Sequence, residues 1–223
     1  MYDFHTHTFL SDGSLSAMEL IRRASVAGYG AVAITDHVGA GSLARVISEI
    51  PHDCALARAY WDIMAIPGVE LTHIPPAAIH DLARRAKELG ASLVIVHGET
   101  LSEPVVRGTN LAAVQCPFVD ILAHPGTLSL EEASSASKNG VFIEITTRKS
   151  HRGPNAEVAR AAIQSGALTL VNSDAHDPED LLDHELIAAT ARAAGIAASQ
   201  LSGTLEKNPA LLLDRLRRSL AKK

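Results

Sequence analysis

Aromatic side chains are scarce in this sequence, where they make up 4% of 223 residues. Any core must therefore be built mainly from alanine, valine, leucine and isoleucine, and the apolar fraction of 47% is sufficient for one. Small aliphatic side chains are typical of buried parallel strands that are covered by alanine-rich helices. The length fits one large domain or two small ones, and a single α/β barrel would use all of it.

Cysteines, positive charge and long apolar runs are also scarce. The two cysteines, Cys54 and Cys116, exclude a disulfide framework and suit a reducing cytosol. A net charge of −5 argues against general nucleic-acid binding, which requires a basic face. No apolar run reaches the length of a membrane span, and the first residues lack the basic region of a signal peptide. We therefore expect a cytoplasmic protein that does not associate with membranes.

What the sequence does contain is a series of histidines and carboxylates, each placed at the end of an apolar run. His5 and His7 come first, and their side chains point the same way if Tyr2 to His5 is a strand. Imidazoles paired in this way commonly hold a metal ion. Further apolar runs end at Asp36-His37, Glu70, His97, His124 and Asp174-Ala175-His176. The repetition, more than any one pair, indicates a metal site.

The apolar runs predict seven strands that alternate with helices, and this order requires a parallel sheet. The expected strands cover 2–5, 31–35, 63–70, 91–97, 118–123, 141–146 and 168–172, with a break near Pro67. Among the helices, one is expected to be interrupted at Pro51, and a last amphipathic helix to run from Pro209 to about Lys222. Ligand-type residues follow six of the seven strands, and strand ends converge on one site at the mouth of a closed barrel. The predicted fold is α/β, a distorted TIM-like (βα)7 barrel that spans 1–223 as a single domain.

Nine side chains are candidates for metal ligands. They are His5, His7, Asp12, His37, Glu70, His97, His124, Asp174 and His176. One divalent ion takes about four to six ligands, so nine candidates imply two or three ions with a bridging carboxylate such as Glu70. Close pairs of ions are suited to the hydrolysis of phosphoric esters, in which a metal-bridging hydroxide attacks phosphorus. Ligands of these types suit Zn, Mn or Fe.

At these residues the sequence resembles the polymerase and histidinol phosphatase (PHP) superfamily of metal-dependent phosphoesterases. The matching stretches are Asp3-Phe4-His5-Thr6-His7, Ser11-Asp12-Gly13, Ile34-Thr35-Asp36-His37, Gly68-Val69-Glu70, Val96-His97-Gly98, Leu122-Ala123-His124-Pro125 and Asn172-Ser173-Asp174-Ala175-His176. The resemblance implies a distorted (βα)7 barrel with a trinuclear site. It assigns His5, His7, Glu70 and Asp174 to the first ion, Glu70, His97 and His124 to the second, and Asp12, His37 and His176 to the third. Some members carry histidine where this chain has Asp12, which leaves the metal and the occupancy of the third position open.

A closer resemblance is to a short-chain, histidinol-phosphatase-like group within this superfamily. Its features are found from Gly68 to Pro76, from Val96 to Thr100 and from Glu144 to Lys149. The resemblance implies a small phosphate ester as substrate, and histidinol phosphate is the first candidate to name. The chain is shorter than the histidinol phosphatases, which leaves little room for a lid that reads the leaving group.

Basic residues follow the expected strand 141–146, whose end carries none of the nine ligand candidates. Arg148, Lys149 and His151 are predicted to bind the phosphate group of a substrate there. Arginine is suited to this role because its guanidinium pairs with two phosphate oxygens at once. The alternative is a solvated basic loop without a role in binding.

Four further polar residues have two interpretations or an indirect role. His73 is a candidate to donate a proton to the leaving group, or it packs beside Pro75. Glu99 either orients a ligand or the substrate, or is an exposed loop carboxylate. Asp3 and Asp36 are expected to orient the ligand histidines.

The sequence therefore predicts a metal-dependent phosphoesterase, a phosphatase-like hydrolase of a small phosphate ester. One alternative is a hydrolase of phosphodiester, phosphotriester, amide or lactone bonds on the same scaffold, because a fold does not fix the chemistry. Another is a non-catalytic metal-binding domain, and the complete set of ligand candidates argues against it. The sequence does not indicate an oligomeric state.

Overall fold

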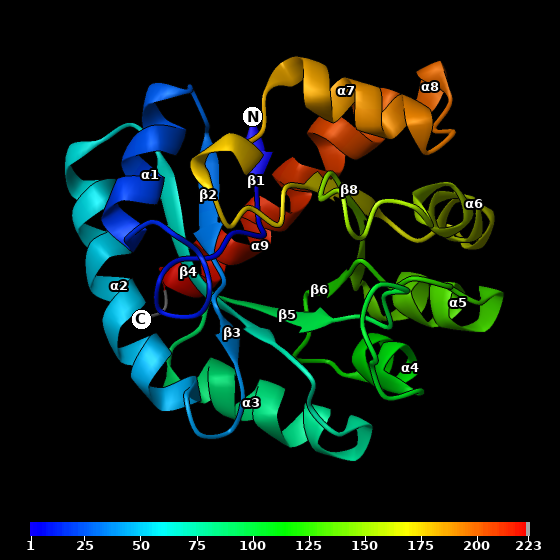
Figure 1. The fold of residues 1–223 in the computed structure, drawn as a ribbon, viewed down its shortest axis with the longest axis horizontal. Helices are drawn as coiled ribbons and strands as arrows, with labels where there is room; N and C mark the ends of the chain where they lie inside the picture. Colours follow the sequence, from blue (N-terminus) through cyan, green and yellow to red (C-terminus); the bar gives the residue numbers. More distant parts are fainter. Residues whose placement is uncertain (222–223) are drawn as a thin grey trace.

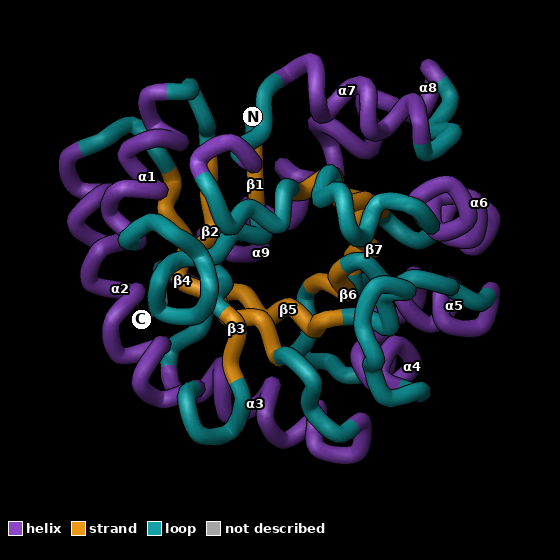
Figure 2. Tube along the Cα trace, viewed as in Figure 1, coloured by secondary structure: helices purple, strands orange, loops and turns teal. Residues whose placement is uncertain are grey.

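Parallel strands curve around the centre of the molecule in the computed structural model, which describes residues 1–221 (Figures 1 and 2). Seven of them follow one another in the order β1-β2-β4-β5-β6-β7-β8. Their bounds are β1 Tyr2–Asp3, β2 Ala31–Ile34, β4 Met64–Leu71, β5 Leu93–His97, β6 Ile121–Ala123, β7 Phe142–Thr146 and β8 Thr169–Asn172. Strand order and direction confirm the predicted α/β, TIM-like barrel.

The barrel closes between β8 and β1 through the residues that follow these two strands. The backbone N–H of Asp174 donates to the carbonyl of His5 at 2.9 Å, and that of His7 donates to the carbonyl of Ala175 at 2.8 Å. A side chain completes the seam, because Asn172 Oδ1 accepts from the N–H of Phe4 at 3.1 Å. Candidate metal ligands from the two ends of the sequence are thus neighbours at the seam.

Helices form a ring outside the strands, as Figure 2 shows. Their bounds are α1 Ala17–Val26, α2 Leu43–Tyr60, α3 Ile79–Leu89, α4 Thr109–Gln115, α5 Leu130–Asn139, α6 Asn155–Ser165, α7 His184–Ala193, α8 Ala198–Ser202 and α9 Asn208–Leu220. Short 3₁₀ turns at Pro76–Ala78 and Pro178–Asp180 and a π-helical turn at Gly203–Lys207 supplement them. Ser16 caps helix α1, with its Oγ accepting from the backbone N–H of Glu19 at 3.1 Å. Within residues 1–221, no helix has the length and apolar character needed to cross a membrane.

The helix α9 closes the bottom of the barrel and lies behind the strands in Figure 1. Its side chains Leu212, Leu213 and Leu216 are buried in the same cluster as residues at the beginnings of the strands, among them Ala31, Leu93, Ile121 and Phe142. The guanidinium of Arg215 lies 5.0 Å from the centre of the Phe142 ring. With one end filled in this way, the opposite end of the barrel is left for a site.

Two prolines do not interrupt their elements as the sequence predicted. Helix α2 runs through Pro51, because the buried stripe that contains Val46, Ile50 and Cys54 continues on both sides of it. A proline removes one helical hydrogen bond, and burial of this stripe outweighs that loss. Strand β4 likewise continues through Pro67, where it changes its pairing from β2 to β5.

Two other details of the fold differ from the expectations. A short strand β3, His37–Val38, pairs with β4 and sets His37 opposite Glu70. Two residues are too few to produce a periodic pattern in the sequence. In α9 the amphipathic pattern predicts a buried side that includes Leu211, but Leu211 is exposed and Leu213 is buried instead. The expected helix end at Lys222 lies outside the described residues.

Candidate metal centre

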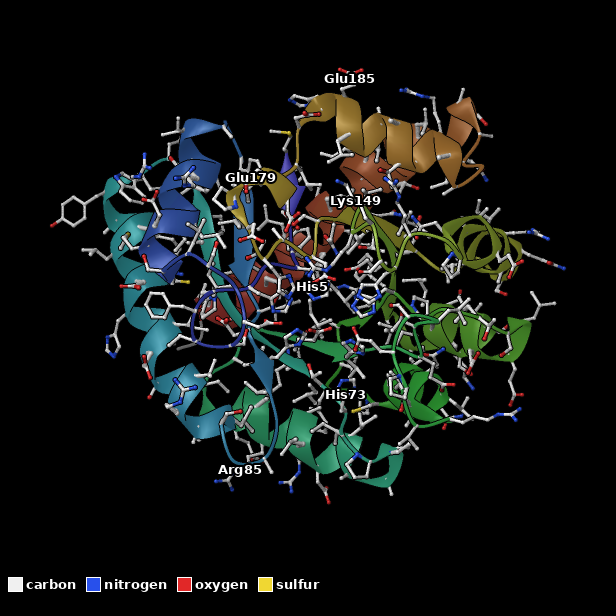
Figure 3. The ribbon with its side chains drawn as sticks, viewed as in Figure 1. His5, His73, Arg85, Lys149, Glu179 and Glu185 are labelled. Carbon is white, nitrogen blue, oxygen red and sulfur yellow. The ribbon has the colours of Figure 1, made fainter. Side chains whose placement is uncertain are left out.

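The nine ligand candidates gather at the mouth of the barrel, where the carboxyl ends of the strands meet. His5 and His7 follow β1, His37 begins β3, and Glu70 and His97 lie at the ends of β4 and β5. His124 follows β6, Asp174 and His176 follow β8, and Asp12 lies in the loop before α1. Figure 3 shows His5 near the centre of the barrel, with His73 and Lys149 on opposite sides of it.

The innermost group consists of His5, His7, Glu70 and Asp174. His5 Nε2 lies 3.4 Å from Glu70 Oε2 and 3.6 Å from Asp174 Oδ1. His7 Nε2 lies 3.7 and 3.1 Å from the same two oxygens. Zinc bonds of about 2.0–2.1 Å in a tetrahedral site separate neighbouring ligand atoms by about 3.3 Å. The four side chains therefore have the spacing of ligands around one ion.

Several buried polar atoms of this group have no hydrogen-bond partner within the described residues. They include His5 Nε2, His7 Nε2, Glu70 Oε1 and Asp174 Oδ1. A buried polar atom without a partner costs about 1–3 kcal/mol, and more where the group is charged. A cation beside His5 Nε2, His7 Nε2 and Asp174 Oδ1 would satisfy these three atoms, and a cation beside His124 would satisfy Glu70 Oε1, so the residues present fit bound metal ions.

Two further groups of donors adjoin the innermost one. Donor atoms of Glu70, His97 and His124 lie within 4.8 Å of one another, with His124 Nε2 3.6 Å from Glu70 Oε1. On the other side, Asp12 lies 3.6 Å from His37 Nε2 and 3.2 Å from His176 Nε2. The structure thus brings together the members of each predicted group, and the assignment of these residues to ions stays a prediction.

Most of the imidazoles are oriented by a hydrogen bond at Nδ1, which leaves Nε2 facing the site. His97 Nδ1 lies 3.1 Å from the carbonyl of Gly98, and His176 Nδ1 lies 2.9 Å from the carbonyl of Asp174. His37 Nδ1 is 2.6 Å from both Thr72 Oγ1 and Glu70 Oε2. Such partners fix the ring orientation and the tautomer that a metal ligand needs.

Glu144 orients His5 in the same way, a role that the sequence did not predict. Its Oε2 lies 2.8 Å from His5 Nδ1 and accepts from Asn172 Nδ2 at 2.9 Å. Its Oε1 accepts from the backbone N–H of His124 at 3.3 Å. The signal in the sequence is a carboxylate in the middle of an apolar strand, where it must be paired if it is buried.

Asp3 and Asp36, which the sequence predicted to orient the ligand histidines, accept hydrogen bonds from the loops that carry them. Asp36 accepts from the N–H and hydroxyl of Thr8 at 2.7 and 2.8 Å and from Ser11 Oγ at 2.7 Å. Asp3 accepts from Ser173 Oγ at 2.5 Å and from the N–H of His5 at 3.3 Å. Both carboxylates therefore position the backbone that carries the ligand candidates.

Backbone strain is concentrated at this end of the barrel. His73, His124 and Asp174 have φ angles of 54°, 24° and 55°, in the left-handed region. Residues other than glycine occupy this region at a cost of about 1–3 kcal/mol, typically at functional sites. The strain aims these side chains into the mouth. Gly98 beside His97 is needed for another reason, because a Cβ there would lie 2.3 Å from the carbonyl oxygen of Ala123.

Burial and charge together set the pKa values in the inner group. Burial raises the pKa of Asp174 to about 7, against the effect of the nearby His5. Burial lowers the pKa of His5, but the carboxylates of Glu144, Glu70 and Asp174 outweigh it and raise this pKa well above its usual value. Burial also lowers the pKa of His7 and of His124, which favours the neutral imidazole that metal ions bind.

Above these groups is a cavity of about 480 Å³, to which three of the predicted substrate residues contribute. Arg148 lines it and donates through Nη1 to the carbonyl of Asp174 at 3.0 Å. His151 lines it with its ring stacked at 4.4 Å on that of His124, and burial lowers its pKa. His73 lines it from the rim and is half exposed.

The other two predicted substrate residues are not among the described residues that line this cavity. Lys149 is exposed beside it. Glu99 accepts from the backbone N–H groups of Gly108 and Asn110 at 2.8 and 3.0 Å, so it ties the loop after β5. In its place the same loop brings Glu103 into the cavity, a residue that the sequence analysis did not select.

Comparisons with known proteins agree with this architecture. No protein-family model matches the chain. The uncharacterized protein MJ1295 of Methanocaldococcus jannaschii is 45% identical over 216 residues, which cover 96% of this chain and 99% of that protein. The DNA polymerase/3'-5' exonuclease PolX of Bacillus subtilis is 26% identical over 208 residues, which cover 85% of this chain and 36% of that protein.

A solved structure shares the fold over nearly the whole length. It is histidinol phosphate phosphatase (HISK) from Lactococcus lactis in complex with Zn, L-histidinol and phosphate. The TM-score is 0.63 at 15% identity, with 92% of this chain and 94% of that chain covered.

The fold and the cluster define a class of protein, the TIM-like barrels whose mouth gathers histidines and carboxylates of the kind that bind metal ions. The chain belongs to one family with MJ1295. Its fold is that of the Lactococcus lactis phosphatase, and its motifs resemble those of the PHP superfamily.

Proposed function

We propose that the protein is a metal-dependent phosphoesterase that hydrolyses a small phosphate ester. The observation that supports this most directly is the position of Arg148. Its guanidinium borders the cavity, and its Nε is 3.6 Å from Oδ2 of Asp174, whose other oxygen, Oδ1, is one of the unpartnered donors of the innermost group. A phosphate group can be held between a guanidinium and a cation site, because both are positive.

Two or three ions such as Zn, Mn or Fe, when bound by the three groups of donors, would supply charge neutralisation for the phosphoryl group and a water of lowered pKa. The residues that fit them are the nine candidates described above, with Glu70 shared between the first and the second group.

The protein side chains around the cavity would bind and orient the ester. Arg148 is held on the cavity wall by Asp180 Oδ2, 3.5 Å from Nη1, and by the carbonyl of Asp174. It would donate to the phosphate oxygens and keep them beside the donor groups. His151 is a second donor, since its Nδ1 is engaged with Thr100 and Ser102 at 2.7 Å while its ring borders the cavity.

His73 is the residue that we propose as proton donor to the leaving group. It lies at the rim, farther from the innermost group than His151 and with access to water, where the alcohol part of a bound ester would project. Imidazole is the side chain that acts most often as a general acid in enzymes.

The substrate class that the site favours is a phosphate monoester of a small alcohol. A cavity of about 480 Å³ accommodates a small metabolite. Histidinol phosphate is the first substrate to test, because the Lactococcus lactis phosphatase of the same fold was crystallised with L-histidinol and phosphate.

A phosphodiester is the second candidate substrate. The observation that favours it is the similarity to PolX, whose name includes a 3'-5' exonuclease activity and which matches 85% of this chain. The same residues would bind the phosphate of a diester. Whether the site prefers a monoester or a diester therefore depends on whether the rim of the cavity has room for the second alcohol group.

The test measures phosphate release from histidinol phosphate and other simple phosphate monoesters, and release of the alcohol from simple phosphate diesters and triesters. The protein is loaded with Mn or Zn, and a chelated sample is the control. Release from monoesters that the chelator abolishes is the expected result. Cleavage of diesters alone would favour the second candidate. No release from any ester, by protein shown to carry its ions, would refute a phosphoesterase.

A further inference from the structure

Glu103 occupies a position at the cavity mouth that neither the nine ligand candidates nor the substrate residues account for. It lies in the loop 98–108 between β5 and α4. Its Oε2 is 3.3 Å from His97 Nε2 and 3.5 Å from His73 Nε2. Among residues 1–221, Glu103 is the acidic residue that lies within 4.0 Å of a ring nitrogen of His97.

His97 has one ring nitrogen free for a metal ion. Its Nδ1 is directed to the carbonyl of Gly98, so Nε2 is the donor atom. Nε2 forms one compact group with donors of Glu70 and His124 on its inner side, and another with Glu103 and His73 on its outer side. One imidazole nitrogen binds one ion, so an ion that His97 Nε2 holds together with Glu70 and His124 is the same ion that Glu103 can reach from the outer side.

We propose that Glu103 is a further ligand of the ion that His97 holds. Glu70, His97 and His124 supply three ligands, and a catalytic zinc site of this kind keeps a fourth position open. Glu103 can reach that position, since its Oε2 lies 3.3 Å from His97 Nε2, which matches the separation of about 3.3 Å between neighbouring ligands of a tetrahedral ion.

Glu103 is also placed to be an exchangeable ligand. Its side chain is 38% exposed, whereas those of His97 and His124 are almost fully buried. The base of its loop is fixed by Glu99, which accepts from the N–H groups of Gly108 and Asn110, so the tip can shift without release of the loop ends. In the same conformation its other oxygen, Oε1, lies 3.6 Å from His151 Nε2, so His151 is a neighbour that can hold the carboxylate once it leaves the ion.

The exchange has a consequence that rests on the proposed phosphoesterase function. A phosphate oxygen and the Glu103 carboxylate carry the same charge and would compete for the open position, since two anions cannot share it. Glu103 would therefore close the site of the free enzyme and weaken the binding of phosphate.

The first experiment measures metal binding without any substrate. Binding of Mn or Zn is followed by competition with a chelator for the unaltered chain, for Glu103→Gln and for Glu131→Gln, an exposed glutamate of α5 that serves as matched control. Glu103→Gln should weaken one ion of the bound set by about tenfold or more. Glu131→Gln should change nothing, and Glu103→Asp should recover part of the affinity. Unchanged metal affinity in Glu103→Gln overturns the proposal.

The second experiment titrates inorganic phosphate into protein saturated with cobalt, whose visible absorption reports the ligands of the ion. Glu103→Gln should alter the absorption of the free protein and bind phosphate several-fold more tightly. An identical spectrum and identical phosphate affinity would overturn the exchange. Both readouts are independent of hydrolysis, so failure of the proposed function is recognised separately, as absent turnover in protein that shows these changes.

Discussion

Arg148 is the side chain that distinguishes a phosphate site from a metal site alone. Its guanidinium borders the cavity, is 28% exposed and is fixed by Asp180 and by the carbonyl of Asp174. Arg148→Ala should raise KM for a phosphate ester by about 10–100-fold, because hydrogen bonds to a charged group contribute about 1.5–3 kcal/mol. Steady-state kinetics with metal content measured on the same samples provides the check.

Arg152→Ala is the matched control, because Arg152 lies in the same loop, is exposed and is not among the described residues that line this cavity. It should leave KM unchanged. If the two variants behave alike, Arg148 is an ordinary loop residue and the phosphate-binding assignment fails.

Asp174 gives the metal site a defined pH dependence. Burial raises its pKa to about 7, so the side chain is protonated below that pH. A ligand must lose its proton to bind a metal, so affinity should fall as pH decreases below about 7, by about tenfold per pH unit for this proton. Above that pH this contribution levels off. Metal dissociation constants measured between about pH 5.5 and 8.5 test the prediction.

The comparison of two asparagine variants isolates the group responsible. For Asp12, burial raises the pKa, but a hydrogen bond with His176 and the charge of His37 lower it to about 2. Asp12→Asn should weaken metal binding but leave the slope of log metal affinity against pH unchanged around pH 6. Asp174→Asn should reduce that slope by about one proton. Equal slopes in both variants would show that the histidines alone determine the pH dependence.

At the scale of elements, α9 tests whether the stability of the barrel can be separated from its site. Leu212 is fully buried among the barrel residues, and its neighbour Leu211 is 41% exposed. Leu212→Ala should reduce the free energy of unfolding by about 2–5 kcal/mol through the cavity that it leaves. Leu211→Ala should reduce it by about 0.5 kcal/mol or less. Urea denaturation of metal-free protein measures both, and metal affinity should be unchanged. A loss of metal affinity in Leu212→Ala would mean that helix α9 also determines the geometry of the metal site at the mouth of the barrel.

The same helices and strands show what a sequence can and cannot predict. The order of strands was predictable because each is a buried apolar run of suitable length that ends at a polar residue. Proline was a misleading signal at Pro51 and Pro67, since its effect is local while the burial that holds α2 and β4 together is tertiary. The roles of Glu144 and Glu103 were not predictable in this way. Glu144 contacts His5, which is 139 positions away in the chain, and only the folded barrel brings the two together. Glu103 is 6 positions from His97, and their contact depends on the course of the loop between them.

For the whole molecule, the seam between the first and last strands is where metal and fold meet. β1 is two residues long, and the seam depends on bonds such as those from the N–H groups of His7 and Asp174. The innermost donors come from both sides of it, His5 and His7 from the start of the chain and Asp174 from residue 174. An ion bound by these side chains would link the two ends of the barrel without any disulfide.

This arrangement predicts where the metal-free protein opens first. A ligand that binds only the closed form stabilises it by about 2.7 kcal/mol at a concentration of about 100 times its dissociation constant. The equilibrium constant for opening is then about a hundredfold smaller. Hydrogen exchange of chelated protein should therefore be faster at the amides of His7 and Asp174 than at that of Asp120, which donates to the carbonyl of Val94 within the continuous sheet. Addition of Zn or Mn should reduce the difference in exchange rate between these amides and that of Asp120. In His124→Ala, which keeps both His7 and Asp174, the added metal should reduce this difference less. Equal exchange at all three amides in the chelated protein would mean that the strand hydrogen bonds alone keep the seam closed, and that bound metal serves the chemistry of the mouth without holding the barrel together.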